Sequence, residues 1–195
     1  MNKSPIGIFD SGIGGVTIFN SIKKLLPKEN IIYLSDNLHS PYGNKSIETI
    51  KKLSQKNTEW LIEKGCKLIV VACNTATTNS VFELRSNFNL PFVGIEPAIK
   101  SAAMKTVTGK VGVLATKGTL SSNLFNSTST YHASNIEIIE ENGDGLVELI
   151  EAGIFEGVEI ENILHKHLYF MINKKIDYLV LGCTHYPLIN KVLLK

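Results

Sequence analysis

Seven short apolar runs recur along this chain, and longer segments with a helical pattern separate them. The runs are continuous and do not alternate with polar positions, as is typical of parallel strands that are covered on both faces. We therefore predict buried strands at Ile6–Phe9, Ile31–Leu34, Leu68–Ala72, Phe92–Ile95, Val111–Ala115, Ile136–Ile139 and Tyr178–Leu181.

Apolar residues at helical spacing mark three of the intervening segments. Their apolar faces consist of Val16, Phe19, Ile22, Leu25 and Leu26 before Pro27, of Ile47, Ile50, Leu53, Trp60 and Leu61, and of Ile160, Ile163, Leu164 and Leu168. Because strands and helices alternate, the pattern predicts an α/β fold with mainly parallel sheets flanked by helices.

A cluster of Pro91, Gly94 and Pro97 interrupts this alternation in the stretch LPFVGIEPAI. Such clusters mark turns and loops, so we predict a domain boundary there. The expected division is an N-terminal α/β domain over residues 1–95 and a second α/β domain over residues 96–195.

The two halves also resemble each other faintly. The first opens with IGIFDSG and the second with VGVLATKG, so that Gly7 and Gly112 lie 105 positions apart. Cys73 in VVACNTAT and Cys183 in LGCTHYP lie 110 positions apart. Two matched strand ends at nearly the same offset suggest an old duplication. They predict two pseudo-symmetric domains with an active site in the cleft between them.

Composition narrows the class of protein. Of the 195 residues, 44% are hydrophobic and 19% are charged, which is typical of a soluble globular protein. The net charge of +2 is small and no basic stripe is interleaved with aromatic residues, so nucleic acid is not an expected partner. The sequence shows neither a secretory signal nor an apolar run of membrane-spanning length. It therefore predicts a cytoplasmic protein without a membrane partner.

In that compartment the three cysteines, Cys66, Cys73 and Cys183, are expected to be free thiols. They form no CxxC pair and have no metal-ligand spacing, so neither a zinc site nor a thioredoxin-like motif is predicted. A free cysteine is most often a core residue, and we assign Cys66 to the core on that ground.

Polar residues stand at four predicted strand ends, which is where open α/β sheets bind ligands. Each end is also expected to lead into the N-terminus of a helix, whose N–H groups attract an anion and lower the pKa of a thiol from roughly 8.5. The four groups are Asp10-Ser11, Cys73-Asn74-Thr75, Thr116 with Thr119, and Cys183-Thr184-His185.

Two equally placed thiols suit one kind of reaction. If Cys73 and Cys183 face each other across a ligand, one thiolate removes a proton from a stereocentre and the opposing thiol returns a proton to the other face. Because such matched groups serve a reactant and product that are mirror images, the pair predicts a racemase or epimerase. Non-catalytic interpretations of two nearby residues stay open. Asp10 could cap a helix, and His185 could be a core histidine that tunes no thiol.

Three further stretches have two readings each. SPYGNKS is either a plain connection or a source of backbone donors, from Tyr42 and Gly43, for a carboxylate. In NGDGLVELIEAG, Glu148 fits a solvated helix face, whereas Glu151 is placed to present a carboxylate near one thiol. The loop DSGIGG serves a tight turn or a phosphate, but it matches neither G-x-G-x-x-G nor a Walker loop, which disfavours nucleotide binding.

Six motifs closely resemble those of the glutamate racemase family: GIFDSGIGG, PYGNKS, VVACNTAT, VGVLATKGT, GLVELIEAG and LGCTHYPLI. They follow the family's order over nearly the whole chain. The resemblance implies a cofactor-independent isomerase that interconverts L- and D-glutamate and supplies D-glutamate for bacterial peptidoglycan. It also implies that the enzyme uses neither PLP nor a metal, and that glutamate is its small-molecule partner.

By the same resemblance, Cys73 acts on the α-proton of D-glutamate and Cys183 on that of L-glutamate. Asp10 and His185 each assist one thiol, and Glu151 is a further assisting carboxylate. The implied substrate contacts are Asp10, Ser11, Tyr42, Gly43, Asn74, Thr75, Thr184 and His185, with Thr116 and Thr119 as additions.

Two departures from the family pattern bear on these expectations. Where the family commonly has a cysteine–proline pair, which is not catalytic, this chain reads ENGDG. The chain stops at Lys195, twelve residues past Cys183, whereas family members continue and return to the first domain. We therefore expect a form that lacks this C-terminal segment and leaves apolar surface on the first domain uncovered. A homodimer stays open.

Other functions stay open as well. Aspartate racemase shares the paired cysteines but needs a shorter pocket, and DSGIGG together with GCTHYPLI favours glutamate. Outside the racemases, the alternatives are an inactive truncated form, a non-catalytic binding protein and a thiol redox protein in which Cys73 and Cys183 form a reversible disulfide.

Overall fold

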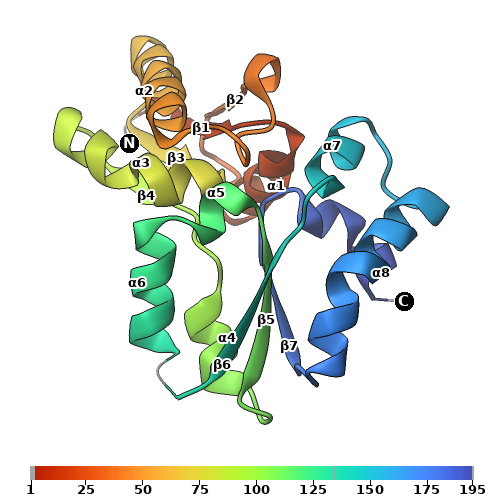
Figure 1. Cartoon of the computed structure of the whole chain (residues 1–195). Helices are drawn as coiled ribbons and strands as arrows, with labels where there is room; N and C mark the ends of the chain where they lie inside the picture. The colour runs from red at the N-terminus through yellow and green to blue at the C-terminus, as the bar shows by residue number, and fades with distance from the viewer. Residues whose placement is uncertain (1–2, 134, 195) are drawn as a thin grey trace.

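The computed structural model, which describes residues 3–133 and 135–194, contains two separate parallel sheets (Figure 1). The first has the strand order β2-β1-β3-β4 and the second the order β6-β5-β7. Every pairing between their strands is parallel. The strands are β1 (Ile6–Asp10), β2 (Ile31–Ser35), β3 (Leu68–Val71), β4 (Phe92–Gly94), β5 (Lys110–Ala115), β6 (Glu137–Asn142) and β7 (Tyr178–Gly182).

All seven predicted strands are confirmed, and one of them is displaced along the chain. The prediction of Ile136–Ile139 for β6 ends too early, because the strand continues to Asn142, which pairs with Ala115. β6 lies at the edge of its sheet and Glu140 is exposed on it. An edge strand tolerates such polar residues, so its apolar run marks only part of its length.

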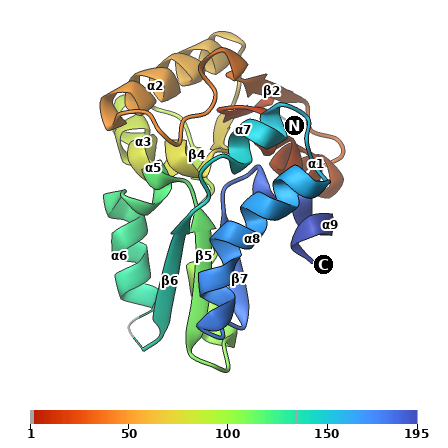
Figure 2. The ribbon, with the colours of Figure 1, turned by 45° about the vertical axis from the view of Figure 1, so that its right-hand side comes forward.

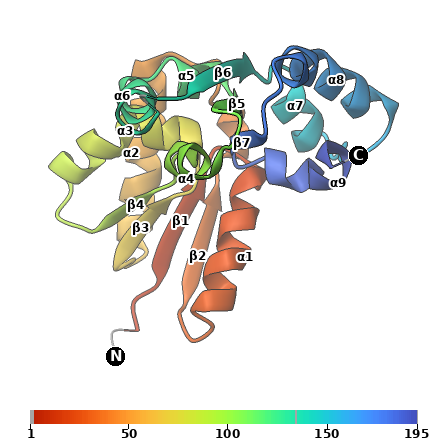
Figure 3. The ribbon, with the colours of Figure 1, turned by 90° about the horizontal axis from the view of Figure 1, so that it is seen from below.

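Helices cover both faces of the first sheet. One face packs against α1 (Val16–Leu25), which lies beside β1 and β2 in Figure 3. The other face packs against α2 (Ile47–Glu63) and α3 (Asn74–Asn87). The apolar face predicted for α1 is only half-buried: Leu25 is 78% exposed and Leu26 is 48% exposed. Ile47 and Trp60 of α2 are likewise exposed, whereas the other positions of its predicted apolar face, Ile50, Leu53 and Leu61, are buried.

Helices also cover both faces of the second sheet. One face carries α4 (Ile99–Lys105) and α6 (Asn123–His132). The other carries α7 (Leu146–Glu151), α8 (Val158–Asn173), the 3-10 helix η3 (Tyr186–Ile189) and α9 (Asn190–Leu193). Figure 2 shows α7 and α8 in succession on the β7 side of the molecule. The predicted α/β fold, with parallel sheets flanked by helices, is confirmed.

The two sheets repeat one topology. In each, the first strand in sequence lies between the next two, since β1 lies between β2 and β3 and β5 lies between β6 and β7. The chain passes from the first sheet to a helix of the second between β4 and α4. The division into residues 1–95 and 96–195 stays a prediction. In the described ranges no helix is long and apolar enough to span a bilayer.

Candidate active site

A compact cavity lies where the carboxyl ends of the two sheets approach each other. The space within it that is open to water is about 10 Å³, which is room for about one water molecule. Ten of the predicted site residues line it: Ser11, Tyr42, Gly43, Cys73, Asn74, Thr75, Thr116, Cys183, Thr184 and His185. Pro41 and Val147 line it as well and were not predicted, although both lie inside motifs quoted for the resemblance.

The topology explains why residues so distant in sequence meet here. β1 and β5 are the central strands at which the strand order reverses, and α/β sheets bind ligands beyond the carboxyl ends at such switch points. Cys73 follows β3 and Cys183 follows β7, the strands that pair with β1 and β5 in the same sense. The two thiols therefore reach one cavity from topologically equivalent positions.

Only one of the four strand ends opens directly into a long α-helix. Cys73 caps α3, and its sulfur accepts a hydrogen bond from the Ala76 N–H at 3.4 Å. Asp10 and Cys183 lead into the 3-10 helices η1 (Ile13–Gly15) and η3, and Thr116 leads into the single turn α5 (Lys117–Leu120). The expectation of a helix N-terminus at every strand end is thus met in full only at Cys73.

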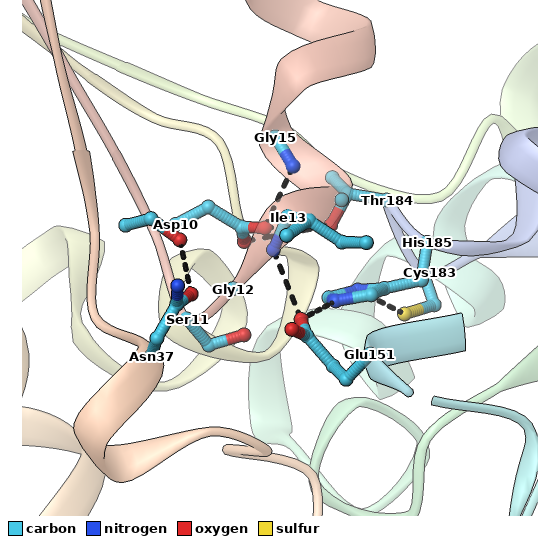
Figure 4. A network of polar contacts seen from close by, with 12 residues as sticks. Asp10, Ser11, Gly12, Ile13, Gly15, Asn37, Glu151, Cys183, Thr184 and His185 are labelled. Carbon is cyan, nitrogen blue, oxygen red and sulfur yellow. Dashed lines mark hydrogen bonds and ion pairs between the residues drawn. The ribbon is translucent and has the colours of Figure 1, made fainter. Parts of the chain in front are cut away.

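The Cys183 side of the cavity carries a linked carboxylate, imidazole and thiol (Figure 4). His185 Nδ1 lies 3.6 Å from Cys183 Sγ, and Nε2 lies 2.5 Å from Glu151 Oε1. The same carboxylate oxygen accepts a hydrogen bond from the Ile13 N–H at 2.9 Å, which joins α7 to the first half of the chain. Glu151 does not line the cavity but supports a residue that does.

The charges of this group follow from its contacts. Burial alone would lower the pKa of His185, but Cys183, Glu151 and Asp10 raise it to about 10. Burial alone would raise the pKa of Glu151, but the bonds from His185 and the Ile13 N–H lower it. At neutral pH the pair is therefore an imidazolium and a carboxylate, and the imidazolium faces the Cys183 sulfur.

The Cys73 side differs. The Cys73 thiol donates a hydrogen bond to Ser11 Oγ, at a distance of 3.6 Å between sulfur and oxygen. Cys73 is only 4% exposed. Burial and the neighbouring Asp10 carboxylate raise the pKa of Cys73 well above its usual range, although the Ala76 N–H opposes them. The expectation that a helix N-terminus lowers the pKa is wrong for this thiol, because desolvation outweighs one backbone hydrogen bond.

Asp10 does not line the cavity and is fully buried. Its Oδ2 accepts a hydrogen bond from the Gly15 N–H at 2.7 Å, and Thr184 Oγ1 lies 3.4 Å from both carboxylate oxygens. Burial raises the pKa of this carboxyl to about 6, against the opposing effect of His185. The reading of Asp10 as a helix cap is wrong, since neither η1 nor α1 has a side-chain cap. Its carboxylate instead binds the backbone of the glycine loop and lies near Thr184 of the second half of the chain.

We expect Asp10→Asn to stabilise the fold at neutral pH. The folded pKa of about 6 exceeds the ordinary value of 3.8, so ionisation destabilises the folded state as the pH rises from about 4 through 6. Above that window the amide should gain up to about 3 kcal/mol over the carboxylate. Urea unfolding of both proteins at pH 4 and pH 7.5 measures this. An equal difference at the two pH values would contradict it.

Three threonine hydroxyls form a buried cluster on another wall of the cavity. Thr75 Oγ1 lies 2.7 Å from Thr116 Oγ1, and Thr119 Oγ1 lies 3.2 Å from each of them. Thr119 is fully buried behind the wall and does not line the cavity. Because hydroxyl groups rotate, the cluster is able to present donors to an anion at this wall.

The side chain of Tyr42 anchors the loop in which this residue lies. Tyr42 Oη donates to Asp36 Oδ2 at 2.5 Å and accepts from Asn57 Nδ2 at 3.1 Å. Burial and Asp36 raise the pKa of Tyr42 above its ordinary range. Its hydroxyl is therefore committed to the protein, which agrees with the prediction that the backbone of this loop serves the site. Sequence reasoning missed Asp36 and Asn57.

Gly43 allows the same loop to touch the second half of the chain. Its carbonyl accepts from the Gly118 N–H at 2.8 Å. A Cβ added at Gly43 would lie 2.8 Å from Thr116 Cβ. Glycine is required here by this close approach.

The remaining expectations concern metals and the third cysteine. Within residues 3–133 and 135–194, no group of three or more His, Cys, Asp or Glu side chains is arranged to hold a metal ion. Cys66 is buried in the core of the first sheet, which confirms its assignment. All three cysteines are free thiols.

Comparison with known proteins bears on the chemistry. The sequence profile of the family described as Asp/Glu/Hydantoin racemase matches residues 6–195. A protein named Glutamate racemase from Clostridium perfringens (strain SM101 / Type A) is 43% identical over 194 residues, which are 99% of this chain and 75% of that protein.

Two solved structures share the fold. Glutamate racemase from Francisella tularensis subsp. tularensis SCHU S4, in complex with D-glutamate, is 34% identical with a TM-score of 0.86; the match covers 99% of this chain and 73% of that one. The Escherichia coli glutamate racemase, in complex with L-glutamate and the activator UDP-MurNAc-ala, is 38% identical with a TM-score of 0.88, covering 98% and 73%.

Proposed function

This chain belongs to the Asp/Glu/Hydantoin racemase family, and from that membership we propose that it interconverts L- and D-glutamate by a two-base mechanism. Cys73 and Cys183 are the two acid–base groups. The observation that carries the proposal is the presence of both cysteines, from equivalent strands of two matched sheets, in the lining of one small cavity.

The two thiols are prepared for different halves of the reaction. The His185 imidazolium lies 3.6 Å from the sulfur of Cys183, the residue to which we assign acceptance of the proton from L-glutamate. The raised pKa of Cys73 keeps that group a thiol, which is the form that donates one. Starting from L-glutamate, the Cys183 thiolate takes the α-proton, and the Cys73 thiol gives its own proton to the opposite face of the carbanion.

The proton balance is complete within the site. After one turnover, Cys183 is a thiol and Cys73 is a thiolate, which is the arrangement that starts from D-glutamate. Return of a proton from Cys183 to Cys73 through solvent restores the first arrangement. His185 and Glu151 hold the charge on the Cys183 side, and Asp10 and Ser11 contact the Cys73 side.

Neutral donors bind the substrate in this proposal. The α-proton of an amino acid is a weak acid, so the α-carboxylate must be held by groups that stabilise negative charge as the carbanion forms. Ser11, Asn74 and Thr184 offer such donors near the thiols, and the hydroxyls of Thr75 and Thr116 offer them to a second carboxylate. The mechanism uses neither PLP nor a metal.

Two relatives support glutamate as the substrate. The Francisella protein was solved with D-glutamate and the Escherichia protein with L-glutamate. By the family resemblance, the D-glutamate formed would supply peptidoglycan synthesis. Aspartate is the alternative substrate, because it also has two carboxylates that need two sets of donors. Its side chain is one methylene shorter than that of glutamate, so it would need a shorter pocket.

The test is racemisation without added cofactor. We expect purified protein to abolish the optical rotation of L-glutamate and of D-glutamate, with both solutions reaching the same racemic end point. L-Aspartate should react far more slowly. Loss of rotation with aspartate alone would shift the proposal to this alternative substrate. A thiol redox protein would leave both rotations unchanged and respond to added reductant instead.

A further inference from the structure

A second buried histidine lies outside the cavity. His167 of α8 is 4% exposed, and both of its ring nitrogens have oxygen partners. Nδ1 lies 2.9 Å from Glu141 Oε1 of β6, and Nε2 lies 2.9 Å from the backbone carbonyl oxygen of Asp144. The carbonyl only accepts, and so does an ionised carboxylate. The Nε2–H group therefore donates to the Asp144 carbonyl.

One partner of His167 lies in the strand before the turn that begins α7, and the other lies in that turn. Gly143, Asp144 and Gly145 connect β6 to this helix, and Gly145 has a φ of +82°, which suits glycine. Within the turn, the Leu146 N–H bonds to the Gly143 carbonyl at 3.3 Å. His167 thus ties a neighbouring helix to the strand before the turn and to the turn itself.

The helix fixed by this turn carries two parts of the site. Val147, in its first turn, lines the cavity together with the cysteines. Glu151, its last residue, lies 2.5 Å from His185 Nε2 and accepts from the Ile13 N–H. α7 has only six residues, so a shift at its start is carried along the helix to Glu151. Figure 2 shows α7 and α8 next to each other on this side of the molecule.

We propose that His167 and Glu141 form a clamp that positions α7, and through Glu151 the imidazole of His185, for proton transfer at Cys183. His167 is a positioning residue, since it touches neither the cavity nor the thiol. The inference rests on the proposed racemase function. It predicts an effect on one of the two proton transfers, because the Asp10 and Ser11 contacts on the Cys73 side do not involve α7.

The test compares His167→Leu with a matched control on the same helix. Leucine removes both hydrogen-bonding nitrogens while filling most of the buried volume. His165→Leu, at an exposed position two residues earlier, is the control. Glu141→Gln, at a partly exposed position, weakens the clamp without changing the buried side chain. For each protein we measure kcat, the free energy of unfolding, and primary isotope effects with α-deuterated L- and D-glutamate.

We expect kcat to fall roughly 10- to 100-fold in His167→Leu, and less in Glu141→Gln. In both, the isotope effect should rise with L-glutamate, whose α-deuteron goes to Cys183, and fall with D-glutamate, whose α-deuteron goes to Cys73. His165→Leu should match the wild type.

A purely structural histidine would lower the free energy of unfolding but leave both isotope effects at their wild-type values, which would overturn the proposal. So would an equal change for the two enantiomers, or the same change in His165→Leu. Absence of racemisation in the wild type would instead contradict the proposed function, so the two failures are distinguishable.

Discussion

Replacing Cys73 or Cys183 by alanine is expected to lower kcat/KM for racemisation by about 10³-fold or more, whichever enantiomer is the substrate. Each turnover needs one thiolate to accept the α-proton and one thiol to donate a proton, and general acid–base groups contribute roughly 10²–10⁴-fold each. Alanine at either position removes one of these groups. Both sulfurs are buried in the lining of the same cavity, and no other residue in that lining is a cysteine.

The effect must be equal for the two enantiomers. L- and D-glutamate have the same free energy in water, so the ratio of kcat/KM in the two directions is fixed at one in any variant. An apparent loss in one direction only would therefore indicate a different reaction, such as deamination. Polarimetry from both enantiomers, with amino-acid analysis of the final mixture, separates these cases.

Cys66→Ala is the matched control for this series. Cys66 is buried in the core of the first sheet beside Gly7 and does not line the cavity. Its loss removes a small core side chain and should cost about 1 kcal/mol of stability without changing kcat/KM of the folded protein. Full racemase activity in either of the other two alanine variants would refute the two-base assignment.

His185→Asn is expected to produce the second-largest effect, a roughly 10²- to 10³-fold fall in kcat. Asparagine keeps a polar side chain of smaller size but carries no positive charge beside Cys183. The carboxylate of Glu151 would then lose the partner 2.5 Å away and face the Cys183 sulfur without an intervening cation. Both changes disfavour a thiolate at Cys183.

The pH dependence identifies the cause. The pKa of His185 is raised to about 10, so the imidazolium persists through neutral pH and is lost as the pH rises through that value. Wild-type kcat should therefore fall on the alkaline side near pH 10, and the Asn variant should lack this limb while remaining slow throughout. A variant that keeps the alkaline limb would show that another group controls it.

The same raised pKa has a consequence for stability. Because the folded pKa of about 10 lies above the ordinary value of 6.5, the protonated histidine stabilises the fold fully below pH 6.5. That contribution is lost progressively as the pH rises from about 6.5 through 10. The direction is opposite to that of a salt-bridged carboxylate, whose contribution is lost on acidification.

The sequence predicted the architecture because its central strands β1, β3 and β5 are almost wholly buried. Continuous apolar runs such as Leu68–Ala72 belong to central strands covered on both faces, and these were located to within a residue or two. The exception, β6, is an edge strand whose polar residues lie outside the apolar run. Helix faces were predicted less well, because whether Leu25 or Trp60 is buried depends on what packs against them.

The residues of the site were predictable for a topological reason. Parallel strands bring their carboxyl ends to one edge, so polar residues placed after apolar runs gather there without further information. Val147 was missed because it is one apolar residue within an amphipathic helix and carries no chemical signal. Tyr33, which donates to the Gly12 carbonyl at 2.6 Å, was missed because its hydroxyl lies within an otherwise apolar strand run.

The electrostatic state of the site could not be predicted from sequence. A helix N-terminus after Cys73 favours a lowered pKa, yet complete burial and the neighbouring Asp10 raise it. These effects depend on packing between segments that are 63 positions apart. The asymmetry between the two thiols, one beside an imidazolium and one beside a carboxyl, is therefore a property of the fold and not of either motif.

Early-time racemisation of L-glutamate in D2O tests the two-base assignment most directly. The reaction is stopped at a few per cent conversion, the enantiomers are separated, and the α-position of each is examined by mass spectrometry. The account predicts deuterium in the D-glutamate formed and protium in the remaining L-glutamate, because one thiol removes the proton and the other supplies deuterium. Protium retained in the product, or deuterium appearing equally in the remaining substrate, would show that a single base serves both faces and would contradict it.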